Sequence, residues 1–227
     1  MKKIFNVATY KRDIFLFKTI ESIYNQSDVI NISLNSHKEV PKQLIDSKIN
    51  CYITDNSIGD GFKFYKLSDS NGYYFTIDDD IIYPSNYSEY MINKYNQYDG
   101  KYVVTLHGRT FLNSPINSYY RSPHISYRCL GNVNNDTIIQ FGGTGVMMFH
   151  TNLLKFNYTK ILKPNMGDIW LSIFAKEKNI KIMCLKHMSS FLEYQKDVGN
   201  ETIFDNYKMN DDYQTKLVNK RYFLIKK

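Results

Sequence analysis

Short apolar runs alternate with amphipathic segments along the first half of the chain. Runs rich in Val, Ile, Phe and Tyr predict buried strands over residues 5–9, 29–34, 50–54, 72–77 and 101–106. After the first run, Leu16, Ile20 and Ile23 fall on one face of a helix that Asp13 can cap. A stripe of Tyr and Met over residues 87–98 predicts another helix. This alternation predicts an α/β fold in which helices flank a mostly parallel central sheet.

The second half has a less regular pattern. Residues 110–137 carry prolines, paired tyrosines and Asn-Asn turns, which predicts a long loop. The apolar run over residues 137–150 is interrupted by Gly142-Gly143-Thr144-Gly145, which indicates a bulge or a close approach of a ligand to the backbone. A helix is expected over residues 165–178 and a last sheet strand over residues 181–185.

The periodicity ends near residue 197. We therefore expect one domain over residues 1–195 and a polar, basic C-terminal extension over residues 196–227.

In the N-terminal half, the turn Gly59-Asp60-Gly61 is expected to lead into a short helix through Phe62, Tyr65 and Leu67.

Composition restricts the classes of partner. The formal net charge is +7, which fits an anionic partner such as a nucleotide, an anionic glycan or a membrane surface. Lysines far outnumber arginines and form no dense basic stripe, so nucleic acid is not the expected partner.

The three cysteines are far apart and form no CxxC motif, which favours free thiols in a reducing, cytoplasmic compartment. No apolar run has the length of a signal peptide or a membrane span.

Three consecutive carboxylates end the fourth predicted strand. Asp78, Asp79 and Asp80 repel one another, and a divalent cation would offset that repulsion. Carboxylate oxygens suit Mg²⁺ or Mn²⁺, especially when the phosphates of a substrate complete the coordination. The alternative is a solvated acidic turn without a ligand.

Other polar residues also follow predicted strands. In a parallel sheet, ligands bind beyond the carboxyl ends of the strands, so these residues should line one edge together with the Asp triplet. They are Thr9, Asn35, Asp55 and His107. Arg109, two residues after His107, could bind a phosphate or an acidic acceptor, and a structural ion pair is an equally open interpretation.

The chain resembles the family 2-like glycosyltransferases of the A-type fold. The resemblance covers residues 4–190 and rests on the N-terminal α/β half, the strand that ends in Asp78-Asp79-Asp80, and the later Gly167-Asp168-Ile169-Trp170 segment. It implies a single Rossmann-like A-type domain. The Asp triplet resembles the DXD motif of that family, which holds Mn²⁺ or Mg²⁺ against the donor diphosphate. The spacing to Pro84 would make Asp79 the metal ligand, whereas the literal motif would make it Asp80, and both assignments stay open.

The resemblance also implies roles for single residues. Asp168 resembles the general base of inverting transfer, although Gly167 stands where that family usually has Glu. His187 resembles the histidine that completes the metal site. The residues expected at the nucleotide are Thr9, Asn35, Asp55, Asp60, Lys63, Asp78 and Asp79, with Asp55 and Asp60 at the uracil and ribose. His107 and Arg109 are left for the acceptor or a phosphate.

The implied function is metal-dependent transfer of a sugar from a nucleotide-diphosphate donor, with a UDP-sugar favoured, to a glycan or lipid-linked glycan in bacterial surface polysaccharide synthesis. The basic tail could contact the inner face of the membrane. One alternative is a metal-dependent sugar nucleotidyltransferase, although such enzymes usually carry a Gly-rich loop after the first strand and Ala8-Thr9-Tyr10-Lys11-Arg12 has no glycine. The other is an inactive nucleotide-sugar or glycan-binding module.

Overall fold

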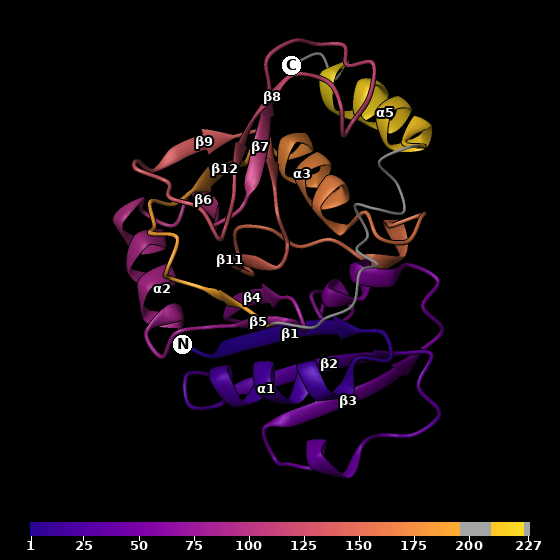
Figure 1. The fold of residues 1–227 in the computed structure, drawn as a ribbon, viewed down its shortest axis with the longest axis vertical. Coiled ribbons are helices and arrows are strands. Elements are labelled where there is room, and N and C mark those ends of the chain that lie inside the picture. Colours follow the sequence, from indigo (N-terminus) through magenta and orange to yellow (C-terminus); the bar gives the residue numbers. More distant parts are fainter. Residues whose placement is uncertain (196–209, 225–227) are drawn as a thin grey trace.

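A mixed sheet of eight strands, in the order β3-β2-β1-β4-β11-β6-β12-β9, runs through the computed structural model (Figure 1). The structure describes residues 1–195 and 210–224. The strands of this sheet are β1 (Lys3–Thr9), β2 (Val29–Asn35), β3 (Ile49–Thr54), β4 (Tyr73–Ile77), β6 (Tyr102–Thr105), β9 (Thr137–Ile139), β11 (Val146–His150) and β12 (Lys181–Cys184). The α/β class predicted from the alternating pattern is therefore confirmed.

The strand directions bring most of the carboxyl ends to one edge. Strands β3, β2, β1 and β4 pair in parallel. Strand β11 is antiparallel to both β4 and β6, so β6 again runs in the direction of β4, and β12 is parallel to β6. Only β11 and the edge strand β9 run the other way. The sheet is thus mostly but not wholly parallel, and the beginning of β11 lies at the edge where the parallel strands end.

Helices cover both faces of the sheet (Figure 1). On one face lie α1 (Asp13–Tyr24) and α2 (Tyr87–Gln97), whose buried residues share a core with β1, β2 and β4. Leu16, Ile20 and Ile23 are buried as the pattern predicts. On the other face, α3 (Gly167–Glu177) packs Trp170 and Ile173 into a second core. Burial of each such side chain contributes about 1.5–3 kcal/mol.

A small second sheet, β10-β7-β8, occupies the region expected to be a long loop. It consists of β7 (Gly108–Phe111), β8 (His124–Tyr127) and β10 (Phe141–Gly142). The loop prediction for residues 110–137 is wrong at its start, where β7 continues to Phe111, and in its middle, where β8 pairs with β7. Strand β8 buries no residue fully, so the apolar alternation that identifies a strand is missing.

The remaining elements are short. They are the 3-10 helices η1 (Lys42–Leu44), η2 (Gly59–Phe64) and η3 (Tyr158–Lys160) and the paired strands β5 (Ile81–Ile82) and β13 (Glu193–Tyr194). The predicted helix through Phe62 is therefore a 3-10 helix.

The prediction that Asp13 caps α1 is wrong. The Asp13 side chain makes no capping bond and instead contacts Nε2 of His37 at 2.7 Å.

Part of the predicted extension packs on the domain. Helix α5 (Asp212–Val218) and the π-helical turn η4 (Asn219–Phe223) follow one another, and α5 contacts α3. Val218 and Tyr222 are buried in the core that α3 also lines. The rest of the extension, residues 196–209 and 225–227, lies outside the described residues, and so do the last two lysines of the basic tail proposed to contact a membrane. Among the helices of the described ranges, none is long and apolar enough to span a bilayer.

Candidate functional site

A buried lysine lies at the centre of the polar edge, which is the edge of the eight-stranded sheet where β1 ends at Thr9 and β4 is followed by Asp78, Asp79 and Asp80. Lys63, on η2, has only 3% of its side chain exposed and forms an ion pair with Oδ1 of Asp78, the residue after β4. Burial alone lowers the pKa of Lys63, but the charges of Asp78 and Asp60 outweigh it, so the pKa is raised. Lys63 therefore stays an ammonium at neutral pH and depends on its carboxylate neighbours.

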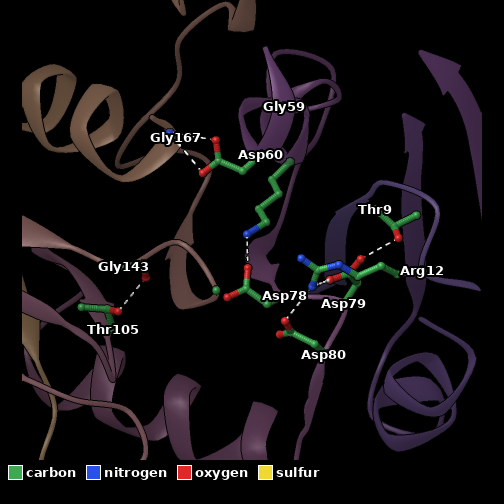
Figure 2. Close-up of polar contacts among 12 residues, drawn as sticks. Thr9, Arg12, Gly59, Asp60, Asp78, Asp79, Asp80, Thr105, Gly143 and Gly167 are labelled. Atoms are coloured by element: carbon green, nitrogen blue, oxygen red, sulfur yellow. Dashed lines mark hydrogen bonds and ion pairs between the residues drawn. The ribbon is translucent and has the colours of Figure 1, made fainter. Parts of the chain in front are cut away.

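Asp60 connects this lysine to α3. Both carboxylate oxygens of Asp60 accept from the backbone N–H of Gly167, at 3.1 and 3.2 Å, so Asp60 caps α3 from a distant part of the chain (Figure 2). Burial raises the pKa of Asp60 to about 6, Lys63 opposes that rise, and the charge of Asp168 adds to it. The structure thus gives Asp60 a structural contact, while its expected place at uracil or ribose stays a prediction.

The three carboxylates of the triplet have different surroundings. The Asp78 side chain is 42% exposed, whereas those of Asp79 and Asp80 are 10% and 15% exposed. Asp79 accepts from the hydroxyl of Thr9 at 2.6 Å, and Arg12 Nη1 lies 3.4 Å from Asp79 and 2.8 Å from Asp80. Asp79 is therefore held inside by β1, while Asp78 faces solvent.

Negative charge is in excess among these groups. Burial, together with repulsion from Asp78 and Asp79, raises the pKa of Asp80 to about 7, although Arg12 opposes the rise. Burial also raises the pKa of Asp79. Four carboxylates, those of Asp60 and the triplet, face the two cations Lys63 and Arg12. An additional cation at this edge would be stabilised.

Asp168 lies in the first turn of α3, as the sequence suggested. Its Oδ1 accepts from the N–H of Ile169 at 2.8 Å, and its Oδ2 accepts from the hydroxyl of Tyr119 at 3.3 Å. Burial raises the pKa of Asp168, and the positive charge of Arg109 opposes that rise. The Arg109 guanidinium lies 4.7 Å from the Tyr119 ring and 5.5 Å from the Tyr120 ring. Asp168 thus has a hydroxyl, a helix start and a guanidinium around it.

The two candidate histidines follow β6 and β12, which lie on the opposite side of β11 from β4 and the Asp triplet. Burial lowers the pKa of His107 to about 4, Arg109 lowers it further, and the charge of Asp78 opposes this. His107 is therefore neutral at pH 7, and its Nδ1 accepts from the N–H of Cys129 at 3.3 Å, which places the proton on Nε2. The ring nitrogens of His187 contact backbone oxygens, Leu185 O at 2.7 Å and Arg128 O at 3.1 Å. No carboxylate is among the hydrogen-bond partners recorded for His187 in the described structure.

Two of the expected nucleotide contacts are used within the fold. The Asn35 amide donates to Asn56 and to the carbonyl of Gly59, both at 3.1 Å, and its oxygen accepts from Thr54. Asp55 is exposed and accepts from the N–H of Ser57 at 2.9 Å. Hydrogen bonding to the side chain of Ser57, and then to its backbone, lowers the pKa of Asp55. The structure does not bring Asp55 into contact with the triplet through any hydrogen bond or ion pair recorded for the described ranges.

The donor atoms at this edge fit a hard divalent cation. They are carboxylate oxygens, they carry surplus negative charge, and Asp78 is accessible. Across residues 1–195 and 210–224, however, no three His, Cys, Asp or Glu side chains form a ready metal-binding group. Mg²⁺ in particular is often held by one or two carboxylates together with substrate phosphates. Asp78 and Asp80 are the residues that would hold it here.

Sequence reasoning missed three contributors to this edge. Arg12 bridges Asp79 and Asp80, and its place just after β1 was the available signal. Tyr119 contacts Asp168 from within the presumed loop. For Gly145 the sequence indicated a bulge or the approach of a ligand to the backbone, yet a Cβ there would lie 1.9 Å from Oδ2 of Asp78. The close approach expected at this glycine is thus to a carboxylate of the chain itself.

The chain matches no protein-family model. A search of the curated proteins likewise found no match.

Replacing the buried lysine should destabilise the fold in a pH-dependent way. Lys63→Met leaves Asp60 and Asp78 without their cation, and we expect a loss of about 2–3 kcal/mol at pH 7.5. This is below the ~3–5 kcal/mol of a fully buried pair, because Asp78 remains accessible to water. In the variant the pKa of Asp60, which burial already raises, rises further above its unfolded value, so the folded state binds more protons and the loss should shrink toward pH 5.

Urea unfolding of Lys63→Met at both pH values measures this. Lys101→Met is the matched control, because Lys101 pairs with Asp99 in solvent at 2.9 Å and should change stability little. Equal stability of Lys63→Met and the wild type at pH 7.5 would contradict the central role given to Lys63.

Adding a methyl group at position 145 should displace Asp78. The new Cβ of Gly145→Ala cannot remain 1.9 Å from Oδ2, so the Asp78 side chain must rotate away from Lys63. We expect a loss of about 1–3 kcal/mol in the free energy of unfolding. Gly131→Ala, whose Cβ would meet nothing closer than 3.4 Å, should stay near the wild type in the same denaturation series. If both variants unfold alike, the fit of Asp78 against Gly145 is not important.

Proposed function

We propose that this chain is a metal-dependent glycosyltransferase of the A-type fold. It moves a sugar from a nucleotide-diphosphate donor, with a UDP-sugar favoured, to a glycan or lipid-linked glycan, with inversion at the anomeric carbon. The place in bacterial surface polysaccharide synthesis rests on the sequence resemblance alone. A cytoplasmic location rests on the three free cysteines, and contact with the inner membrane face rests on the basic tail.

One observation carries the proposal: Asp78, an exposed carboxylate, and Asp80, a carboxylate of raised pKa, follow the end of the central strand β4 near the buried Lys63. This edge has surplus negative charge that a divalent cation would neutralise, and it lies where ligands bind in mostly parallel sheets. A diphosphate would bring its own negative charge, for which Lys63 and Arg12 supply the nearest positive charges.

The transfer assigns a separate task to Asp168. The acceptor hydroxyl oxygen forms a bond to the anomeric carbon, the bond from that carbon to the diphosphate oxygen breaks, and the nucleoside diphosphate leaves with the electron pair. The hydroxyl proton moves to Asp168, whose pKa is raised by burial and thus lies closer to that of an effective base. The Tyr119 hydroxyl, 3.3 Å from Oδ2, orients the carboxylate. When bound, a divalent cation offsets the charge on the departing diphosphate.

An inactive binding module remains the second candidate, and a specific observation favours it. In this structure Lys63 and Arg12 already pair with all three carboxylates of the triplet. Such internal pairing would be sufficient for a domain that only binds a nucleotide sugar. A nucleotidyltransferase is distinguished by its product, because it would release pyrophosphate from a nucleoside triphosphate.

Metal dependence of nucleotide binding is the first test. Calorimetric titration with UDP should show binding in the presence of Mn²⁺ and a large loss after chelation. Asp78→Asn should weaken the Mn²⁺-dependent part by about tenfold or more. Asp69→Asn is the matched control, since Asp69 also pairs with a lysine, Lys66, but in solvent. Equal UDP affinity with and without Mn²⁺ would contradict a metal bridge.

Turnover separates the enzyme from a binding module. We expect release of a nucleoside diphosphate from one member of a panel of nucleotide sugars with Mn²⁺. Asp168→Asn should lower kcat by roughly 10²–10⁴ while UDP affinity stays near the wild type, because a base acts mainly in the transition state. Asp212→Asn, which changes an exposed carboxylate that also lies in the first turn of a helix, should leave kcat unchanged. Normal turnover by Asp168→Asn would place the base elsewhere.

A further inference from the structure

Arg12 occupies Asp80, one of the two carboxylates that a divalent cation would need. Its Nη1 lies 2.8 Å from Oδ2 of Asp80 and 3.4 Å from Oδ1 of Asp79 (Figure 2). The contact to Asp80 is a charge-assisted hydrogen bond of ordinary length, whereas the one to Asp79 is long. Arg12 therefore sits mainly on Asp80, from which a metal ion would have to displace it.

The backbone of Arg12 is fixed while its side chain can move. Its carbonyl accepts from the N–H groups of Phe15 and Leu16, at 3.1 and 3.0 Å, so the residue forms the start of α1. The side chain, by contrast, is 31% exposed, and among the described contacts only Nη1 bonds to the carboxylates. A change of rotamer would release Asp80 without any change of the fold.

Lys63, the other cation, cannot release its carboxylate in the same way. Its ammonium is almost fully buried, and it balances Asp60, which caps α3, as well as Asp78. Its withdrawal would leave a buried carboxylate unpaired, which costs far more than exposing a partly solvated one. The two cations therefore differ in kind: Lys63 is permanent, and Arg12 is exchangeable.

We propose that Arg12 is a stand-in cation that neutralises Asp80 in the free protein, yields it to a divalent cation, and then pairs with the diphosphate of the donor. This rests on the proposed function, since it needs a metal ion and an anionic donor at the same edge. The guanidinium suits both states, because its planar donors match carboxylate and phosphate oxygens equally well. In the free protein, Arg12 weakens metal binding, and in the loaded protein it strengthens donor binding.

The proposal predicts opposite signs for one substitution. Without nucleotide, Arg12→Gln should bind Mn²⁺ about tenfold more tightly than the wild type, because the competing cation has gone. At saturating Mn²⁺, the same variant should bind UDP about tenfold more weakly, because the phosphate has lost its partner. Arg12→Lys, which retains the charge but not the planar fork, should lie between the two in both titrations.

Lys11→Gln is the matched control. It removes one positive charge from the adjacent residue, but Lys11 lies over the Tyr10 ring at 5.1 Å, and no contact to the triplet is recorded for it in the described ranges. Both affinities of Lys11→Gln should stay within about twofold of the wild type, as expected for an exposed charge. The same shift in both variants would reduce the effect to a general change in charge and overturn the proposal.

The outcomes distinguish the two levels of inference. Calorimetry of wild type, Arg12→Gln, Arg12→Lys and Lys11→Gln with Mn²⁺ alone comes first, and UDP at saturating Mn²⁺ follows. Tighter metal binding and weaker UDP binding by Arg12→Gln support the stand-in role. Unchanged Mn²⁺ affinity in Arg12→Gln overturns that role and leaves the proposed function intact. Absence of Mn²⁺ binding in every protein, the wild type included, overturns the metal dependence and the stand-in role together.

Discussion

The polar edge of this protein depends on the burial of a single ammonium group among carboxylates. Lys63 is too deeply buried to remain charged without Asp60 and Asp78, and Asp60 in turn holds the first N–H of α3. The Lys63 carbonyl accepts from the hydroxyl of Tyr74 on β4 at 2.7 Å, so the backbone of η2 is fixed as well. One charge cluster thus sets the relative positions of η2, β4 and the start of α3. Asp168 takes its position from that helix start and therefore depends indirectly on Lys63.

The reversed direction of β11 adds a second constraint. A strand parallel to β4 at the position of β11 would have its carboxyl end at the polar edge. Because β11 is antiparallel, it begins at this edge, directly after Gly143-Thr144-Gly145. The carbonyl of Gly145 accepts from the N–H of Asp78 at 3.2 Å, and its missing side chain leaves room for the Asp78 carboxylate. Gly143 packs in the same way against His107. These glycines lie in the turn between β10 and β11, and the close approach of two polar side chains to the backbone of that turn explains them.

The sequence was sufficient for the parts of the fold that follow from local pattern. Strong apolar runs located the inner strands, and spacing located α1, α2 and α3. Prediction from sequence failed where a strand is weakly buried or where a contact joins distant parts of the chain. Strand β8 lacks alternation, and the capping of α3 by Asp60 joins residues more than a hundred positions apart. For the site, position at a strand end brought Thr9 and the Asp triplet together correctly, since Thr9 bonds Asp79. The same rule could not tell that Asn35 is fully used within the fold, because its partners come from the following turn.

Burial, more than sequence order, separates the roles of the three adjacent carboxylates. Asp79 is enclosed and bonded to Thr9, so it anchors the end of β4 to β1 and offers little to a ligand. Asp78 and Asp80, on either side of it, are paired with cations of different exposure: the side chain of Lys63 is 3% exposed and that of Arg12 is 31% exposed. A central carboxylate fixed in this way holds its two neighbours in place without competing for their ligand. Three charges in a row are therefore compatible with a stable fold, because one is structural and each of the other two has a cation beside it.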